Sequence, residues 1–422
     1  MATLMTPAPA KTDAQLLLSL PVVVAALGYF VDIYDLLLFG IVRIPSLRDL
    51  GLTEAQISTV GARILNWQMA GLILGGILWG VLGDKRGRLS VLFGSIVTYS
   101  LANIACGFVG SVTFMPPTDF YAVMRFVAGI GLAGELGAGI TLVSELLPTR
   151  LRAIGTSLVA GVGISGAVAA YFTVRLFDWQ TAYFVGGGMG LGLLLLRVGV
   201  VESGMFRNVA DRKHVERGNF FAFFTDRNRL GRYLRCIGMG LPAWFCSGIL
   251  GVFSNEFGQA LGIAEPIQPG LAIMGGYLGA AVGDLLSGWL SHALRSRVRA
   301  VALMMAYTLV GFAAYLLIGV KTALFFYTFL GVACIGNGYW AMLVTIGAEQ
   351  FGTNLRATAA TTIPNMVRGT VIGMTSGYLA LKPSLGILGA GAVVGAVCFA
   401  IGFYSILTLP ETHGKNLDFL EE

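Results

Sequence analysis

Glu145-Leu-Leu-Pro-Thr149-Arg-Leu151-Arg152-Ala153 recurs 204 residues later as Glu349-Gln-Phe-Gly-Thr353-Asn-Leu355-Arg356-Ala357. Five of the nine positions are identical, and each box closes a long apolar run. The offset is close to half of the 422-residue chain, so the boxes predict a tandem duplication into two similar halves. In a membrane protein this arrangement favours transport, because two similar halves can rock about a site held between them.

The composition is typical of a membrane-embedded chain. Hydrophobic residues make up 56% and charged residues only 12%, about half the charged share of a soluble domain. The five cysteines form no Cys-x-x-Cys pair, and none of the three histidines lies in the middle of an apolar run. We therefore expect neither a metal site nor another cofactor. The first apolar segment is long and more follow it, which indicates a membrane span and not a cleaved signal peptide.

Apolar runs long enough to cross a ~30 Å hydrocarbon core recur along the whole chain. The twelve expected spans are residues 16–42, 59–83, 89–111, 119–146, 153–176, 179–201, 234–257, 269–292, 299–319, 322–347, 357–381 and 384–409. The predicted fold is an all-α membrane protein with about 12 transmembrane helices in two pseudo-symmetric six-helix bundles. The expected parts are an N-terminal bundle (1–201), a cytoplasmic linker (202–232) and a C-terminal bundle with a short cytoplasmic tail (233–422).

The distribution of basic residues predicts the topology. With the N-terminus in the cytoplasm, most of the 28 lysines and arginines fall in cytoplasmic segments, as the positive-inside rule requires. We expect a multi-pass protein of a bacterial inner membrane with both termini in the cytoplasm. Because the basic residues are spread over separate turns, the net charge of +6 does not indicate nucleic-acid binding.

The second span ends in Gly80-Val-Leu-Gly83-Asp84-Lys85-Arg86-Gly87-Arg88. Glycines permit a tight turn here, and an acid among basic residues can form a charge cluster that latches neighbouring helices. This stretch resembles the loop between helices two and three of the major facilitator superfamily, where it gates the cytoplasmic side. The second half has a degenerate copy, residues 288–297, in which His292 replaces the acid and leaves a matching latch open to question.

Three further stretches resemble that superfamily. The fourth span contains Arg125-Phe-Val-Ala-Gly129-Ile-Gly131-Leu-Ala-Gly134-Glu135, and the chain ends in Leu409-Pro410-Glu411-Thr412-His-Gly414-Lys415-Asn-Leu417. With the first span, residues 28–40, they are similar to the metabolite:proton symporter, organic-ion and sugar-porter-like branches. The resemblance covers essentially the whole chain and implies alternating access by a monomer.

Charged residues inside spans are costly and usually face a partner or a wet cavity. Asp32 and Asp35 share one face of the first span. In similar sugar:proton symporters an aspartate of the first helix pairs with an arginine of the fourth, which implies an Asp35–Arg125 pair. We predict proton coupling through Asp32, Asp35, Arg125 and Glu135, with either aspartate as the titrating acid. A static ion pair is the alternative, and for Glu135 an interhelical hydrogen bond.

In the second half, Arg368 is a natural clamp for a carboxylate or phosphate. Pairing with Asp284 is the alternative, and substrate could displace that acid. Arg63 and Arg197 lie near enough to helix ends to snorkel, so we do not assign them to the site. The predicted substrate-binding residues are Tyr34, Gln68, Arg125, Glu135, Trp244, Asp284, Asn337, Tyr339, Asn365 and Arg368, and Asn66 and Trp340 are further candidates.

A cytoplasmic latch is predicted from the two boxes and the glycine-rich turn. Its members are Gly83, Asp84, Arg88, Glu145, Arg152, Glu349 and Arg356. A second group of ionic contacts at the repeated box is what a duplicated gate requires.

The expected function is a secondary active transporter that moves a small polar organic solute by alternating access. An organic anion with proton symport is the leading hypothesis; a sugar or polyol transporter and a passive facilitator or exporter are the alternatives. No nucleophile elbow, zinc-protease or P-loop pattern stands in a suitable context, so no enzyme is expected. The expected partners are a small-molecule substrate, protons and the lipid bilayer, and no nucleic acid.

Overall fold

The computed structural model describes residues 12–86, 88–135, 143, 147–202, 220–318, 321–414 and 421, with the side chains at 83–86, 88–90, 149–150, 152–154, 156–157, 198–202, 315–318, 353–354 and 357 excepted. These residues form helices and connecting turns, and no strand occurs among them. The predicted all-α fold is therefore confirmed.

The first half consists mostly of long helices, with two short helical pieces between them. They are α1 (Asp13–Leu17), α2 (Leu20–Asp49), α3 (Glu54–Arg86), α4 (Arg88–Gly107), η1 (Val109–Ser111), α5 (Pro117–Leu132), α7 (Thr149–Leu176) and α8 (Trp179–Glu202). Helix α1 begins with a capping box in which Thr12 and Gln15 satisfy each other's backbone N–H groups. The end of the predicted fourth span and Glu145 lie outside the described residues.

The second half contains shorter helical pieces. They are α9 (Ala222–Thr225), α10 (Arg227–Gly238), α11 (Leu241–Phe245), the π-helical η2 (Cys246–Gly251), α12 (Ser254–Ala260), α13 (Pro269–Leu294), α14 (Arg297–Ile318), α15 (Ala323–Ala333), η3 (Cys334–Asn337), α16 (Trp340–Glu349), α17 (Thr353–Gly369) and α18 (Val371–Thr408). Helix α10 starts inside the segment expected as linker. Helix α18 comprises two helices joined at Gly386, whose φ of 69° ends the first of them.

Eight helical stretches of the described chain are long and apolar enough to cross a membrane. One of them, Thr358–Thr408, contains the turn at Gly386 and supplies two of the predicted spans. Together with the shorter helices, the arrangement agrees with about twelve transmembrane helices. The predicted seventh span is interrupted at η2 and the predicted tenth at η3.

Equivalent glycine pairs bring helices together in both halves. A Cβ at Gly71 or Gly75 of α3 would collide with the backbone oxygen of Phe126 or Ile130 in α5. The pair Gly279 and Gly283 of α13 contacts the backbone near α15 and η3 in the same way. Such close backbone approach is typical of membrane helices, where small residues allow dense packing. The repeated spacing supports the duplication predicted from the two boxes.

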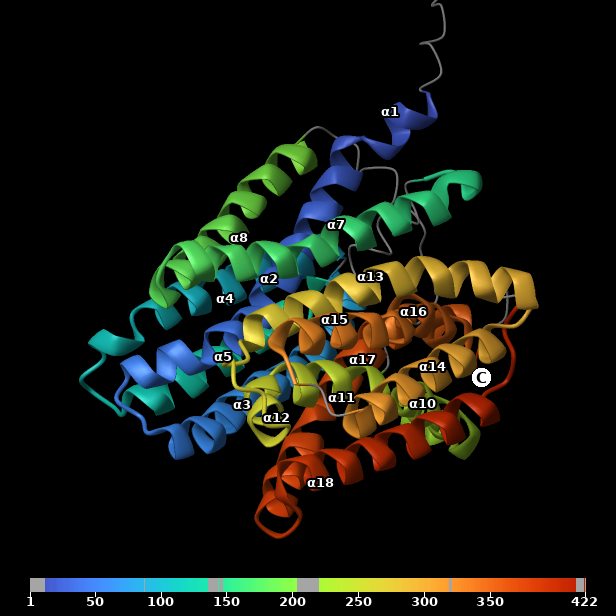
Figure 1. The fold of residues 1–422 in the computed structure, drawn as a ribbon. Coiled ribbons are helices and arrows are strands. Elements are labelled where there is room, and N and C mark those ends of the chain that lie inside the picture. Colours follow the sequence, from blue (N-terminus) through green and yellow to red (C-terminus); the bar gives the residue numbers. More distant parts are fainter. Residues whose placement is uncertain are drawn as a thin grey trace, which may run out of the picture.

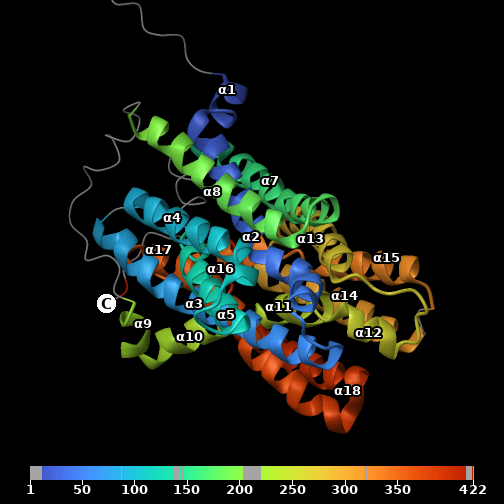
Figure 2. The same cartoon turned by 90° about the vertical axis from the view of Figure 1, so that its left-hand side faces the viewer.

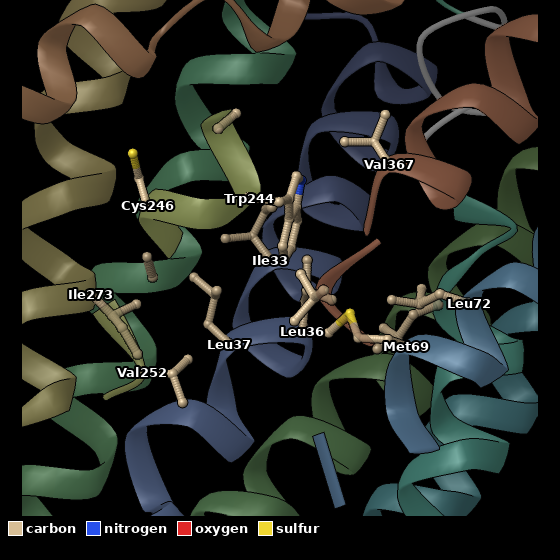
Figure 3. Close-up of a cluster of buried hydrophobic side chains, with 14 of the residues drawn as sticks. Ile33, Leu36, Leu37, Met69, Leu72, Trp244, Cys246, Val252, Ile273 and Val367 are labelled. Carbon is tan, nitrogen blue, oxygen red and sulfur yellow. The ribbon is translucent and has the colours of Figure 1, made fainter. Parts of the chain in front are cut away.

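The two halves lie side by side, with blue-to-green helices at upper left and yellow-to-red helices at lower right in Figure 1. In the view of Figure 2, α16 and α17 of the second half overlap α3, α4 and α5 of the first. Between the halves, α3 packs against α17 and α18, and α13 packs against α2 and α7. Figure 3 shows part of the apolar core at this contact, where Ile33 and Leu37 of α2 lie among Trp244, Val252 and Ile273.

Candidate functional site

A cavity of about 60 Å³ lies between the two halves, halfway along the helices. Most of its wall comes from the second half, and α2 contributes Tyr29 and Ile33. Four of the predicted binding residues line it, and these are Trp244, Asp284, Asn337 and Arg368. The further candidate Trp340 lines it as well. Tyr29 and Tyr277 were not singled out in the sequence, because an isolated tyrosine in an apolar span gives no distinguishing signal.

Arg368 is the cation of this cavity, and its side chain is 1% exposed. Its guanidinium lies 5.9 Å from the ring centroids of both Trp244 and Trp340. On the third side, Nη2 lies 3.7 Å from Oδ2 of Asp32 on α2. Nη1 donates a 3.4 Å hydrogen bond to Asn365 Oδ1, whereas Nε has no hydrogen-bond partner in the described part of the chain. A buried guanidinium beside two indole rings is well placed to bind an anion that carries an aromatic ring.

The two tryptophans occupy the cavity because two helices are broken beside it. Trp244 lies in the short helix α11 next to the π-helical turn η2, and Trp340 begins α16 after the 3₁₀ turn η3. Their ring centroids lie 6.0 Å apart at an interplanar angle of 65°. Breaks of this kind often mark functional positions in membrane helices, because irregular backbone is tolerated where it lines a cavity.

Asp284 caps the broken helix α16. Its Oδ1 accepts a 3.1 Å hydrogen bond from the backbone N–H of Ala341, in the first turn of α16. A carboxylate at a helix N-terminus satisfies free backbone donors and opposes the positive end of the dipole. No ion pair joins Asp284 to Arg368 among the described contacts, so Asp284 fixes Trp340 in the cavity wall and Asp32 takes the place next to the arginine.

Arg125 of α5 lies inside the first half and does not line the cavity. Its guanidinium donates hydrogen bonds to Asn103 Oδ1 at 2.8 Å, to the backbone oxygen of Asp35 at 3.0 Å and to Gln68 Oε1 at 3.3 Å. The implied Asp35–Arg125 pair therefore forms through the main chain. Both carboxylate oxygens of Asp35 are buried, with Oδ1 against Gly186 of α8, and neither has a hydrogen-bond partner among the residues that the structure describes. Asn103 escaped notice in the sequence because polar residues are common in such spans.

Glu135 forms a buried ion pair with Arg197 of α8. The two side chains are 1% and 6% exposed, and Oε1 lies 2.9 Å from Nη1. The sequence assigned Arg197 to the snorkelling residues near a helix end, but its side chain turns inward. Gly28 of α2 makes this possible, because a Cβ there would clash with the arginine. The other discounted arginine, Arg63, pairs with Asp119 at a half-exposed position.

The remaining predicted binding residues hold helices together. Tyr34 donates to the backbone oxygen of Ala182 at 2.9 Å, and Tyr339 donates to that of Met239 at 3.0 Å. Asn365 bridges the halves, since its Nδ2 donates to the backbone oxygen of Ala133 at 2.9 Å. The further candidate Asn66 has a similar role, since its Oδ1 accepts a hydrogen bond from Thr375 Oγ1, between α3 and α18.

Both halves meet firmly on the side of the turn between α2 and α3, which we call the distal side. Arg43 of α2 is fully buried there and donates to the backbone oxygen of Val252 at 2.9 Å and to Asn255 Oδ1 at 3.0 Å. Its guanidinium also lies 4.6 Å from the ring centroid of Phe253. A second contact joins Lys382 of α18 to Ser58 of α3, to whose Oγ it donates at 3.3 Å, while Lys382 also pairs with Glu256 of its own half at 2.7 Å.

The opposite side carries both chain ends, and we call it the terminal side. Most of the predicted latch of the first half lies outside the part of the chain that the structure describes. This applies to Glu145 and to the side chains of Asp84, Arg88 and Arg152, while Gly83 lies near the end of α3. In the second half, Glu349 binds Arg297 at 2.7 Å. An ionic contact therefore exists in the second half although His292 replaces the acid, because Arg297, at the end of the same degenerate copy, pairs with Glu349. Arg356 lies in the first turn of α17, the helix that follows α16, and Glu349 is the last residue of α16.

The tail that follows α18 is anchored to the start of α14. Glu411 accepts hydrogen bonds from Ser296 Oγ and from the backbone N–H groups of Arg297 and Val298, and thereby caps that helix. Burial on its own raises the pKa of Glu411, but these bonds, with one from the N–H of His413, outweigh it and lower the pKa to about 2.

Within the described part of the chain, no group of three or more His, Cys, Asp or Glu side chains is placed to bind a metal ion. Six ionisable groups form what we call the central network: Asp32, Asp35, Glu135, Arg125, Arg197 and Arg368. If all are ionised, their charges sum to zero.

Known proteins resemble this chain over nearly its whole length. A gentisate transporter of Corynebacterium glutamicum is 24% identical over 90% of this chain and 86% of its own. A gallate transporter of Pseudomonas putida is 26% identical over 87% of each chain. Among solved structures, the proton:xylose symporter XylE bound to 6-bromo-6-deoxy-D-glucose superposes with a TM-score of 0.69 at 17% identity, covering 96% of this chain and 98% of its own. At that identity the likeness shows the fold alone.

The profile of the Major Facilitator Superfamily matches residues 25–387. This match covers most of both halves, and the fold and the broken helices around a central cavity agree with it. The chain is thus a multi-pass integral membrane transporter and not an enzyme, and it belongs to the Major Facilitator Superfamily.

Proposed function

We propose that this transporter carries small aromatic carboxylates by alternating access, together with protons. One observation carries the proposal: the guanidinium of Arg368 lies beside the rings of Trp244 and Trp340, 5.9 Å from each ring centroid, in a cavity that is otherwise largely apolar. A carboxylate would bind the guanidinium, and an aromatic ring would pack against the indoles. The relatives named for gentisate and gallate transport support this substrate class, because both compounds are aromatic carboxylates.

Proton coupling follows from the partner that Arg368 already has. A substrate carboxylate at the guanidinium competes with Asp32, whose oxygens have no hydrogen bond in the structure. Displaced as an anion, Asp32 would remain as an uncompensated buried charge, which is costly in a membrane interior. We infer that Asp32 takes up a proton when substrate binds. One proton then accompanies each monovalent anion, and the central network stays neutral.

Asp35, Arg125, Glu135 and Arg197 have supporting roles in this scheme. The Glu135–Arg197 pair and the contacts of Arg125 fix the first half around Asp32. The buried and unbonded carboxylate of Asp35 offers a second place for a proton, three residues from Asp32. Protons would thus move along α2, while substrate contacts the walls of the second half.

We further propose that the distal side faces outward and that both termini lie in the cytoplasm of a bacterial cell, with the protein in the inner membrane as a monomer. The contacts of Arg43 with Val252 and of Lys382 with Ser58 then close the outer entrance. Opening it requires their rupture while the terminal-side latch closes. That latch would contain Gly83, Asp84, Arg88, Glu145 and Arg152, with Glu349 and Arg356 as their counterparts in the second half.

The test is uptake of radiolabelled benzoate into proteoliposomes with an alkaline lumen. We expect uptake that is driven by the pH gradient, is abolished by a protonophore and is lost in Arg368→Gln. The matched control is Arg63→Gln, which removes a half-exposed arginine far from the cavity and should leave uptake intact. Transport that is indifferent to Arg368, or that xylose inhibits as well as aromatic acids do, would overturn the proposal and favour a sugar carrier.

A further inference from the structure

We propose that Asn337 selects, among aromatic carboxylates, those with a hydroxyl group on the ring. This inference rests on the proposed function and deepens it, because it assigns the second polar contact of the substrate. Asn337 ends the 3₁₀ turn η3 and lines the cavity, where it is 7% exposed. No other element of the transport scheme uses its side chain.

The orientation of the Asn337 amide is fixed by its surroundings. Nδ2 donates a 3.2 Å hydrogen bond to the backbone oxygen of Ala243. A carbonyl oxygen can only accept, so the nitrogen must face Ala243 and Oδ1 must point away from it. Among the described residues, Oδ1 has no hydrogen-bond partner. A buried acceptor without a partner is unfavourable, so the side chain lacks a donor that a ligand can supply.

Arg368, in the wall of the same cavity, has an unpaired donor that complements the unpaired acceptor of Asn337. Its Nε is a buried donor without a hydrogen-bond partner, while Nη1 and Nη2 contact Asn365 and Asp32. Arg368 and Asn337, both in the cavity wall, therefore hold one cationic donor and one neutral acceptor without a partner among the described residues, and Trp244 and Trp340 form the aromatic walls. A ring that bears a carboxylate and a hydroxyl group provides the matching acceptor and donor.

This polarity also sets the orientation of the substrate. A carboxylate next to Asn337 Oδ1 would oppose two acceptors, whereas next to Arg368 it makes a charge-assisted bond. The hydroxyl group is thus directed toward Asn337. An unsubstituted or methylated ring fits the apolar walls but leaves Oδ1 unpaired, and sites built to bond a hydroxyl discriminate strongly against analogues that lack it. We expect at least a tenfold preference, consistent with the cost of one unpaired buried acceptor.

The experiment measures inhibition of labelled benzoate uptake in proteoliposomes by 2-, 3- and 4-hydroxybenzoate, and by methyl- and methoxybenzoates substituted at the same positions. For one hydroxyl isomer we expect an inhibition constant at least tenfold below that of benzoate. The methoxy analogue at that position keeps the oxygen but cannot donate, so it should lose the advantage. Equal inhibition by all compounds, with benzoate transport intact, would overturn the inference and spare the proposed function. No transport of any aromatic acid would overturn both.

The residue itself is tested with Asn337→Leu, which keeps the volume and removes the acceptor. The ratio between the inhibition constants of benzoate and of the preferred hydroxybenzoate should fall to about one, at whatever rate of benzoate uptake the variant retains. If the preference survives unchanged, Asn337 does not read the hydroxyl group. Should this variant fail to assemble, the same ligands are compared by how much each raises the thermal stability of the unmodified protein in detergent. If the methoxy analogue stabilises the protein as well as the hydroxyl compound does, the ligand does not donate a hydrogen bond to Oδ1 and the inference is refuted.

Discussion

Arg368 of α17 and Asp32 of α2 approach to 3.7 Å, and this ion pair joins the two halves at the wall of the cavity. Both side chains are almost completely removed from solvent. A buried pair of this kind contributes little net stability, yet the loss of one partner is costly because the other charge stays behind. Placed between the halves, the pair makes their relative position sensitive to protonation and to an incoming anion.

The first prediction concerns this pair as a thermodynamic unit. Asp32→Asn leaves the guanidinium of Arg368 buried without its anion, and Arg368→Gln leaves the carboxylate of Asp32 without its cation. Each single change should lower the free energy of unfolding by about 3 kcal/mol. The double variant removes both charges and should recover most of the loss. Thermal unfolding in detergent at neutral pH measures all four proteins.

Coupling between these residues would be refuted if the double variant were as unstable as the two single changes added together. Recovery of stability should not restore transport, because the double variant still lacks the cation that binds substrate. Benzoate uptake by the double variant is expected to stay below about 1% of the wild-type rate, as the loss of a charged hydrogen-bond donor costs up to about 3 kcal/mol.

A second prediction separates structure from transport at Glu135. Because Glu135 pairs with Arg197 and does not line the cavity, Glu135→Gln should destabilise the protein by about 3 kcal/mol through the arginine left unpaired. The KM for substrate should change less than threefold in the folded fraction. Substrate titration of initial uptake rates, corrected for folded protein, checks this. A tenfold rise in KM with unaltered stability would instead place Glu135 at the substrate.

Much of the architecture could be predicted from the sequence because membrane spans are long apolar runs and their boundaries are set by charge. The duplicated boxes gave the two halves, and Trp244, Asn337 and Arg368 lie in the predicted cavity. Residue type alone was sufficient there, since an arginine in mid-span requires a buried anion or a wet cavity.

The pairing of the buried charges could not be predicted in the same way. Arg197 was assigned to a helix end by its distance along the chain, whereas its direction depends on the space that Gly28 leaves on another helix. Similarly, the motif placed Asp35 near Arg125, but Arg125 donates to the backbone oxygen of Asp35 and not to its carboxylate. Such choices depend on side-chain rotamers across three helices, which no periodicity along one helix records.

A third prediction tests the distal closure. Arg43→Gln removes the guanidinium that bonds to Val252 and Asn255, so the distal entrance should open more often. Cys246 and Cys334 line the cavity and report access to it. Their labelling by a membrane-impermeant thiol reagent, located by mass spectrometry, should increase about tenfold if one hydrogen-bonded contact of about 1.4 kcal/mol is lost.

The control for this closure is Arg48→Gln. Arg48 lies on the same side but forms an exposed pair with Glu54, where the two side chains are 62% and 69% exposed. Exposed pairs contribute little, so labelling should stay at the wild-type level. Equal labelling of the Arg43 and Arg48 variants would show that Arg43 does not hold the entrance closed.

The last prediction concerns pH and the cap at the start of α14. The pKa of Glu411 is lowered from 4.5 to about 2 in the folded protein, so its stabilising contribution is complete above pH 4.5 and is lost as the pH falls toward 2. Glu411→Gln should therefore destabilise the protein at pH 7 by about 1 kcal/mol, the usual value of a helix cap. The difference from wild type should shrink at pH 3, because the wild-type carboxylate is then partly neutralised in the unfolded state and gains less on folding. Thermal unfolding of both proteins at pH 7, 5 and 3 tests the sign. A gap that widens on acidification would mean that the charge of Glu411 opposes folding, and that Ser296 and the backbone donors of α14 do not stabilise it as an anion.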